Sequence, residues 1–207
     1  MLQKDQIKTL FKQTLPGTKA HERMAPPGRN VHEAIPSHGR WSAVMILLFL
    51  KNNEWHTVFI KRTHDGKSHS GQIAFPGGKK EPFDSELKDT ALRECEEEIG
   101  IGAQEIEIVG QLSNIYIPPS NFIVSPFVGI VHTIDHHQIS TKEVEALLSV
   151  PLSQLFCNQS KQHSQVVSSH SLIVHETPAY VLRDNTIIWG ATAMMVSELE
   201  YLWQGCM

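Results

Sequence analysis

The sequence predicts an α+β fold in which helices cover a mixed β-sheet. Runs rich in Val, Ile, Leu and Phe, typical of buried strands, are interspersed with a few helical segments. These strands do not alternate regularly with helices, as they would in a wholly parallel α/β sheet. The chain has 207 residues, of which 41% are hydrophobic, so it is long enough for one domain with a sizeable core.

The first half of the chain predicts a helix, a connector and several strands. Apolar residues recur at helical spacing from Leu2 to Phe11, and the prolines of Met24–Arg29 disfavour a helix there. Asn52-Asn53 is typical of a hairpin turn, and Pro76-Gly77-Gly78 is expected to stop a strand. The predicted strands are Trp41–Leu50, His56–Arg62, Gln72–Phe75, Glu105–Leu112 and Asn121–His132.

The second half adds helices and short strands. The predicted helices are Ser85–Ile99, Glu143–Leu148, Pro151–Phe156 and Ala191–Trp203. The predicted short strands are Leu172–His175, Ala179–Leu182 and Thr186–Trp189, with Trp189 expected in the core. We divide the chain into an N-terminal helix and connector, residues 1–30, and a main domain, residues 31–207. The N-terminal helix is expected to pack on the domain surface, or alternatively to form a contact in a homodimer.

Composition excludes several classes of protein. The net charge of −4 argues against a nucleic-acid partner, which needs a basic surface. Three scattered cysteines without CxxC spacing favour a reducing compartment over a disulfide framework. The first residues lack the apolar core of a signal peptide, and no apolar run is long enough to span a membrane. We therefore expect a cytoplasmic protein without a membrane partner.

The most informative segment is acidic. On a helix, Glu94, Glu97 and Glu98 stand at i, i+3 and i+4 and share one face, while Cys95 falls on a buried face. Arg93 can pair with Glu97 one turn later. Crowded carboxylates repel each other unless a cation binds them, and hard divalent cations prefer oxygen ligands. Taken alone, such a run indicates a solvated acidic surface; the preceding glycines favour a metal and phosphate site.

These residues resemble the Nudix hydrolase family, whose box reads G-x5-E-x7-R-E-U-x-E-E-x-G-U with U apolar. Arg93 to Ile101 match the second half of this box, with Cys95 in an apolar position. In the first half of the box, we take Gly78 as the motif glycine. The chain then has one residue more than the family pattern between this glycine and Arg93, and Asp84 occupies the position of the first glutamate. The resemblance implies a Nudix-like α/β/α sandwich.

An upstream stretch resembles the coenzyme A pyrophosphatase branch of that family, whose motif reads L-L-T-x-R-[SA]-x3-R-x3-G-x3-F-P-G-G. Its positions are occupied here, with agreeing spacing, by Arg62, Lys67, Gly71, Phe75, Gly77 and Gly78. Lys67 stands where the branch has arginine, which keeps the charge but loses the bidentate fork. The box of this branch is also one residue longer.

The resemblance implies hydrolysis of the pyrophosphate bond of coenzyme A to 3′,5′-ADP and 4′-phosphopantetheine, with Mg²⁺ or Mn²⁺ as cofactor. Glu94, Glu97 and Glu98 would hold the metal, and Arg93 would orient the glutamates. The catalytic base stays open among several glutamates: Glu97, Glu98, Glu143 and Glu145.

Substrate selection would fall to Arg62, Lys67 and the Gly71–Phe75 segment, which could recognise the 3′-phosphate. Two alternatives remain. One is hydrolysis of another nucleoside diphosphate derivative, such as ADP-ribose or NADH. The other is a catalytically silent binding module.

Overall fold

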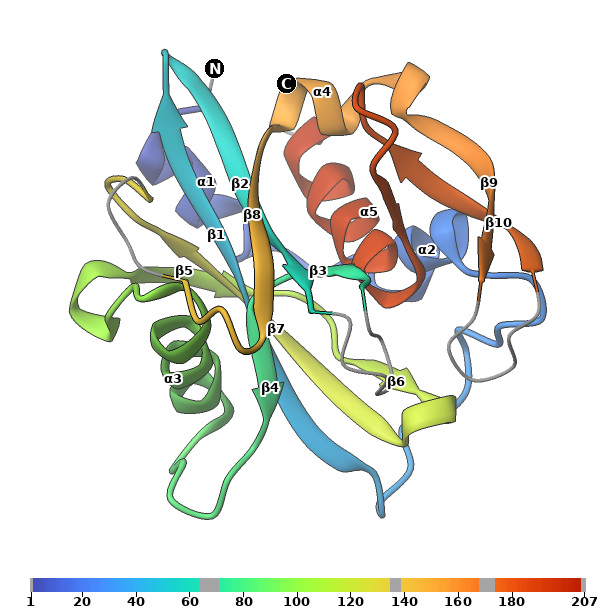
Figure 1. The fold of residues 1–207 in the computed structure, drawn as a ribbon, viewed down its shortest axis with the longest axis horizontal. Coiled ribbons are helices and arrows are strands. Elements are labelled where there is room, and N and C mark those ends of the chain that lie inside the picture. Colours follow the sequence, from blue (N-terminus) through green and yellow to red (C-terminus); the bar gives the residue numbers. More distant parts are fainter. Residues whose placement is uncertain (1, 64–70, 135–138, 168–173, 206–207) are drawn as a thin grey trace.

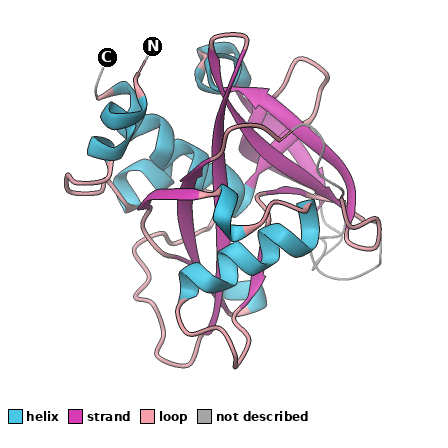
Figure 2. Cartoon of the chain, turned by 90° about the vertical axis from the view of Figure 1, so that its left-hand side faces the viewer, coloured by secondary structure: helices cyan, strands magenta, loops and turns pink. Residues whose placement is uncertain are grey.

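The computed structural model describes residues 2–63, 71–134, 139–167 and 174–205, and a mixed β-sheet lies at its centre (Figures 1 and 2). The strands of this sheet are β1 (Arg40–Lys51), β2 (Glu54–Arg62), β3 (Ile73–Ala74), β4 (Gly77–Lys79), β5 (Glu107–Gln111), β6 (Ile115–Ile117), β7 (Phe122–Ile130) and β8 (Val144–Pro151). The sheet has the order β3-β2-β1-β7-β5, and β4, β6 and β8 pair with β1, β7 and β2 respectively. β1 and β7 run parallel, and β1 and β2 antiparallel, so the predicted mixed sheet is confirmed.

Helices cover both faces of this sheet, which confirms the predicted α/β/α sandwich. Helix α3 (Leu87–Ile99) lies on one side of the strands and α5 (Gly190–Gln204) on the other (Figure 1). Successive side chains of a strand point to opposite faces. Met45 and Leu47 of β1 accordingly belong to the core under α3, whereas Ile46 and Leu48 belong to the core under α5.

The N-terminal segment packs into the layer that contains α5. It forms three short helices: α1 (Lys4–Leu10), α2 (Thr18–His21) and η1 (Glu22–Met24). Ile7 and Leu10 are fully buried, which agrees with the predicted amphipathic helix. The Ser197 hydroxyl donates to the Ala20 carbonyl at 2.7 Å, so α5 and α2 are tied together. The division at residue 30 stays a prediction.

The C-terminal third adds a small sheet beside α5. Its strands, in the order β11-β10-β9, are β9 (Lys161–Val167), β10 (Val174–Val181) and β11 (Ile187–Trp189). Two short helices precede it, α4 (Leu152–Phe156) and η4 (Asn158–Ser160). The sequence predicted α4 and parts of β10 and β11 but not β9. Part of the predicted strand Leu172–His175 lies outside the described residues.

One predicted helix was wrong. Glu143–Leu148 is not helical, because Val144–Pro151 forms β8 and pairs antiparallel with β2 from Arg62 to His56. Pairing with a neighbouring strand overrides the local helix preference of this segment. Glu143 therefore lies in the turn that leads into a strand.

The expected strand stop at Pro76-Gly77-Gly78 was also only partly right. Gly77–Lys79 forms β4 and pairs antiparallel with β1 at Ser42–Val44. A Cβ at Gly77 would lie 2.4 Å from the Ala43 carbonyl oxygen, so only glycine permits this close approach. β6 was not predicted either, since its three residues are too few to show a pattern.

Helix α3 ends at Ile99 as its sequence predicts, but it begins at Leu87, two residues after the predicted Ser85. Asp89 accepts a hydrogen bond from the Glu86 backbone N–H at 2.9 Å near the start. Gly100 follows the last turn in the left-handed conformation, with φ of 74°. Cys95 is fully buried against the sheet. Within the described residues, no helix has the length and apolar character needed to cross a membrane.

Candidate active site

A pocket of about 1190 Å³ lies between the two helix layers at one end of the sheet. One wall consists of α3, the Gly77–Lys79 strand and the turn before β8. The opposite wall consists of the first turn of α5 and the connector Pro26–Asn30. The sequence singled out five glutamates for metal binding or base catalysis. All of them except Glu145 line the first wall: Glu94, Glu97, Glu98 and Glu143.

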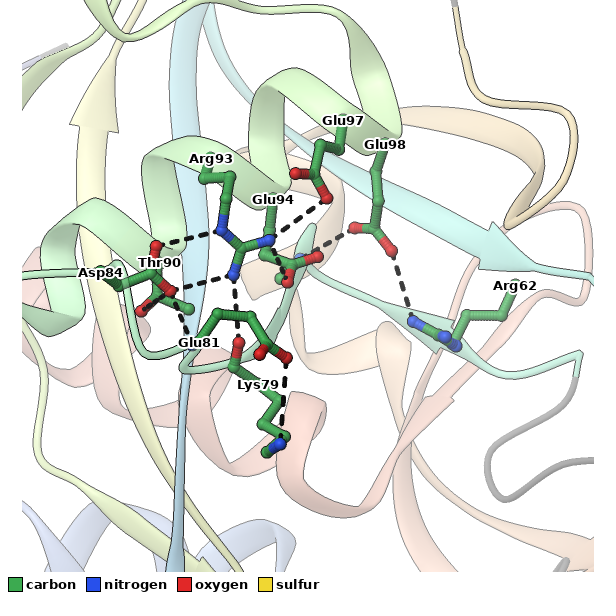
Figure 3. Close-up of polar contacts among 10 residues, drawn as sticks. Arg62, Lys79, Glu81, Asp84, Thr90, Arg93, Glu94, Glu97 and Glu98 are labelled. Atoms are coloured by element: carbon green, nitrogen blue, oxygen red, sulfur yellow. Dashed lines mark hydrogen bonds and ion pairs between the residues drawn. The ribbon is translucent and has the colours of Figure 1, made fainter.

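Arg93 lies at the centre of the acidic face (Figure 3). Its Nη1 donates to Glu94 at 2.8 Å and to Glu97 at 3.2 Å, and its Nη2 donates to the Lys79 carbonyl at 3.1 Å. The helix face and the β4 strand are therefore connected through one guanidinium group. This geometry agrees with the predicted role of Arg93 in orienting glutamates.

Asp84 holds Arg93 from the other side. Its carboxylate accepts from Arg93 Nε at 3.1 Å and Nη2 at 3.0 Å, and from the Thr90 hydroxyl at 2.9 Å. The hydrogen bond from Arg93 is the main cause that lowers the pKa of Asp84 to about 2. Asp84 is only 5% exposed, so it is a buried anchor for the arginine.

Glu98 is the most deeply buried of the four glutamates. One carboxylate oxygen accepts the Gly77 backbone N–H at 2.9 Å, and the other lies 3.4 Å from Arg62 Nη1. Burial is the main cause that raises the pKa of Glu98 to about 7, and the charges of Glu94 and Glu143 act in the same direction.

Glu94 lies directly against the glycine turn. A Cβ at Gly78 would lie 2.4 Å from the Glu94 carboxyl carbon, so any larger residue would displace this side chain. Burial raises the pKa of Glu94, and the charges of Glu97 and Glu143 add to this effect. Glu143 thus lies close enough to act on both buried glutamates.

The donor set fits a hard divalent cation, since it offers carboxylate oxygens that repel one another without a positive charge between them. As the side chains stand, the described residues contain no group of three His, Cys, Asp or Glu side chains already arranged around a metal position. The reason is visible in Figure 3: Arg93 binds Glu94 and Glu97, while Arg62 binds Glu98. Binding of a cation would require these contacts to be exchanged.

The remaining predicted residues divide into three groups. Arg62, Phe75, Gly77 and Gly78 line the pocket. Gly71 and Glu145 do not line it, and Glu145 forms an ion pair with Lys61 at 2.5 Å. Lys67 lies outside the described residues.

Sequence reasoning missed much of the wall opposite the glutamates. Trp189 is half-buried and lines the pocket, so the expectation of a core residue was wrong. Two arginines also line it: Arg29, which donates to the Tyr116 carbonyl, and Arg40, whose guanidinium lies 4.2 Å from the centre of the Phe122 ring. No local motif marks these residues, because separate segments bring them together.

Comparisons with known proteins agree with this architecture. The family model of the NUDIX domain matches residues 39–169. The uncharacterized Nudix hydrolase NudL of Yersinia pestis is 33% identical over 161 residues, which cover 77% of this chain and 78% of NudL. Nudix hydrolase 3 of Caenorhabditis elegans is 28% identical over 169 residues, which cover 75% of this chain and 70% of that protein.

A solved structure shows the same fold. The crystal structure of a MutT/nudix family protein from Enterococcus faecalis aligns over 96% of this chain and 73% of its own, with a TM-score of 0.54 and 14% sequence identity. At this identity the likeness concerns the fold alone. The family model covers more than half of the chain, and NudL is similar over most of its length. This chain therefore belongs to the Nudix family.

Proposed function

We propose that this chain is a divalent-metal-dependent pyrophosphohydrolase that cleaves coenzyme A to 3′,5′-ADP and 4′-phosphopantetheine. The observation that carries the proposal is the gathering of Glu94, Glu97 and Glu98 beside the Gly77-Gly78 turn in one pocket. A solvated acidic surface would leave these side chains away from any cavity. Two of the three are instead largely buried, which costs free energy unless a cation or a proton compensates the charge.

The chain would bind Mg²⁺ or Mn²⁺ through Glu94, Glu97 and Glu98. A bound divalent cation supplies positive charge for the phosphates and makes a water molecule more acidic. Arg93 orients Glu94 and Glu97, and Asp84 in turn orients Arg93. Arg62 lines the same pocket beside Glu98, so its guanidinium group can also contact a phosphate oxygen.

Glu143 is the residue that we propose as the catalytic base outside the helix. It lines the pocket, and its backbone carbonyl accepts the Thr63 N–H at 3.1 Å, which fixes the turn next to Arg62. Glu97 and Glu98 remain candidates for the same role. Glu145 is less suitable, because its carboxylate pairs with Lys61 away from the pocket.

The choice of coenzyme A rests on the motif from Arg62 to Gly78. Phe75, Gly77 and Gly78 of this motif line the pocket, which supports a role in substrate binding. We retain Lys67 as a proposed contact to the 3′-phosphate. The pocket volume is large enough for an extended ligand, since typical small-molecule sites occupy about 300–1,000 Å³.

A substrate panel tests the proposal. The purified protein would be incubated with Mg²⁺ or Mn²⁺ and coenzyme A, ADP-ribose, NADH or a dinucleoside polyphosphate, and the products identified by mass. We expect 3′,5′-ADP and 4′-phosphopantetheine from coenzyme A as the fastest reaction. Faster cleavage of ADP-ribose or NADH would overturn the choice of substrate. No cleavage of any compound would favour a silent binding module.

A further inference from the structure

The first turn of α5 faces the pocket without a cap. Trp189 occupies the N-cap position and makes no side-chain hydrogen bond to the helix. Gly190, Ala191 and Thr192 line the pocket. The register of β10 with β11 assigns the Gly190 N–H to the Pro178 carbonyl, which leaves the N–H groups of Ala191 and Thr192. The first N–H groups of a helix also lack partners inside it. These donors are therefore available to a ligand.

A second observation at the same place points to a missing partner. Thr177 of β10 is fully buried and lines the pocket, yet its Oγ1 has no hydrogen-bond partner. Thr177 lies two residues before Ala179 in β10, and Ala179 pairs with Trp189 of β11. Thr177 and the first turn of α5 therefore line the same pocket at the Ala179 end of this pairing. A buried hydroxyl without a partner costs free energy, which a ligand oxygen can recover.

The charges around this turn suit an anion. The part of the pocket wall contributed by residues 174–205 contains no ionisable side chain; it consists of Thr177, Trp189, Gly190, Ala191, Thr192, Met194 and Met195. The N-terminus of a 15-residue helix carries a partial positive charge that attracts phosphate. The acidic wall comes from α3 on the other face of the sheet (Figure 1). Metal and anion would thus bind at opposite walls.

The first turn is also held firmly against the strand that leads to the glycine turn. The Thr192 hydroxyl donates to the Ile73 carbonyl of β3 at 3.2 Å. From Ile73 the chain continues directly through Phe75 to Gly77, whose N–H binds Glu98. A ligand spanning from α5 to the glutamates would therefore cross only this short segment.

We propose that the first turn of α5 and the Thr177 hydroxyl form a subsite for the 3′-phosphate of coenzyme A, separate from the region that binds the pyrophosphate. This inference rests on the proposed function for the identity of the substrate. It assigns substrate recognition to residues beyond 39–169, the part matched by the family model. The hydroxyl and the N–H groups donate hydrogen bonds to phosphate oxygens, and the helix end supplies the electrostatic attraction.

The chain offers a matched control. Thr57 of β2 is also fully buried with an Oγ1 that has no partner, but it does not line the pocket. Replacing either threonine with valine keeps the shape and removes a hydroxyl that binds nothing in the free protein. Both variants should fold, with melting temperatures no lower than that of the wild type.

The test measures binding of two nucleotides that have no pyrophosphate to cleave, 3′,5′-ADP and AMP, by titration calorimetry. They differ only in the 3′-phosphate. We expect the wild type to bind 3′,5′-ADP about tenfold more tightly than AMP or better, the size of effect for a hydrogen bond to a charged group. Thr177→Val should weaken this preference severalfold, while the contact proposed for Lys67 remains in the variant. Thr177→Ser, which restores a hydroxyl, and Thr57→Val should keep the preference.

Two outcomes would overturn the subsite: equal binding of both nucleotides by the wild type, or an unchanged preference in Thr177→Val. A weakened preference in Thr177→Val supports the subsite even if coenzyme A is not hydrolysed, because neither probe is a substrate. Failure of the proposed activity and failure of this inference are therefore distinguishable.

Discussion

The Glu98 carboxylate accepts the backbone N–H of Gly77 at 2.9 Å, although 21 residues separate them along the chain. This contact joins the two halves of the Nudix box in space. It holds the acidic helix against the glycine turn and keeps Glu98 inside the pocket. Because Glu98 is 1% exposed, the contact also supplies part of the hydrogen bonding that its buried carboxylate needs.

Replacing the acids of this face should abolish most of the activity. Glu97→Gln or Glu98→Gln should lower kcat by about 10²-fold or more, the size expected for loss of a charge-stabilising group. Steady-state kinetics on coenzyme A with Mg²⁺ measures the effect. Glu96→Gln is the matched control, because Glu96 lies on the same helix but is exposed and outside the pocket. Full activity of Glu97→Gln or Glu98→Gln would exclude that residue as a ligand or base.

Asp84→Asn should loosen Arg93 and thereby the glutamates that Arg93 contacts. The substitution weakens two hydrogen bonds between charged groups, and we expect a loss of about 2 kcal/mol in the free energy of unfolding. The kcat should fall while the KM for coenzyme A changes little, since Asp84 does not line the pocket. Urea unfolding and kinetics would check both effects. An unchanged kcat would show that Arg93 keeps its position without Asp84.

The stability contributed by Asp84 should depend on pH in one direction. Its folded-state pKa of about 2 lies below the ordinary value of about 3.9, because Arg93 favours the ionised carboxylate. The contribution is therefore fully present above the unfolded-state pKa and is lost as the pH falls through about 2. The difference in unfolding free energy between wild type and Asp84→Asn should shrink on acidification. A difference that stays constant down to about pH 2 would contradict this assignment.

Glu143 and Glu145 should behave differently, although they are two residues apart. Glu143 lines the pocket, whereas Glu145 pairs with Lys61. Glu143→Gln should lower kcat by about 10²-fold, as expected for loss of a general base. Glu145→Gln should leave kcat within about twofold, since an exposed ion pair contributes little. The reverse order of effects would assign the base to Glu145 instead.

Lys67→Ala tests the cation that the motif places near the substrate. The variant should lose more kcat/KM on coenzyme A than on dephospho-coenzyme A, because only the former carries the 3′-phosphate. Loss of a charge-assisted contact corresponds to about tenfold or more. Equal losses on the two substrates would remove Lys67 from recognition of the 3′-phosphate. Lys80→Ala, a lysine outside the pocket-lining residues, is the control.

Where the sequence carried a strong local pattern, its predictions were confirmed. The long apolar runs gave β1, β2 and β7, and the spacing of Glu94, Glu97 and Glu98 placed them on one helix face. Where pairing with a distant strand decides the conformation, local patterns were misleading. The segment after Glu143 has helix-forming residues, but it forms a strand because it pairs with β2.

The amino-acid sequence by itself determined the acidic helix, its glycine cap and the glycine turn, because each depends on residues within a few positions of one another. Only the tertiary structure decided that Asp84 anchors Arg93, that Glu143 rather than Glu145 lines the pocket, and that Thr177 lines the same pocket as the first turn of α5. Those relationships arise where strands and helices from distant parts of the chain pack together. Such contacts depend on three-dimensional distance, which spacing along the sequence does not encode.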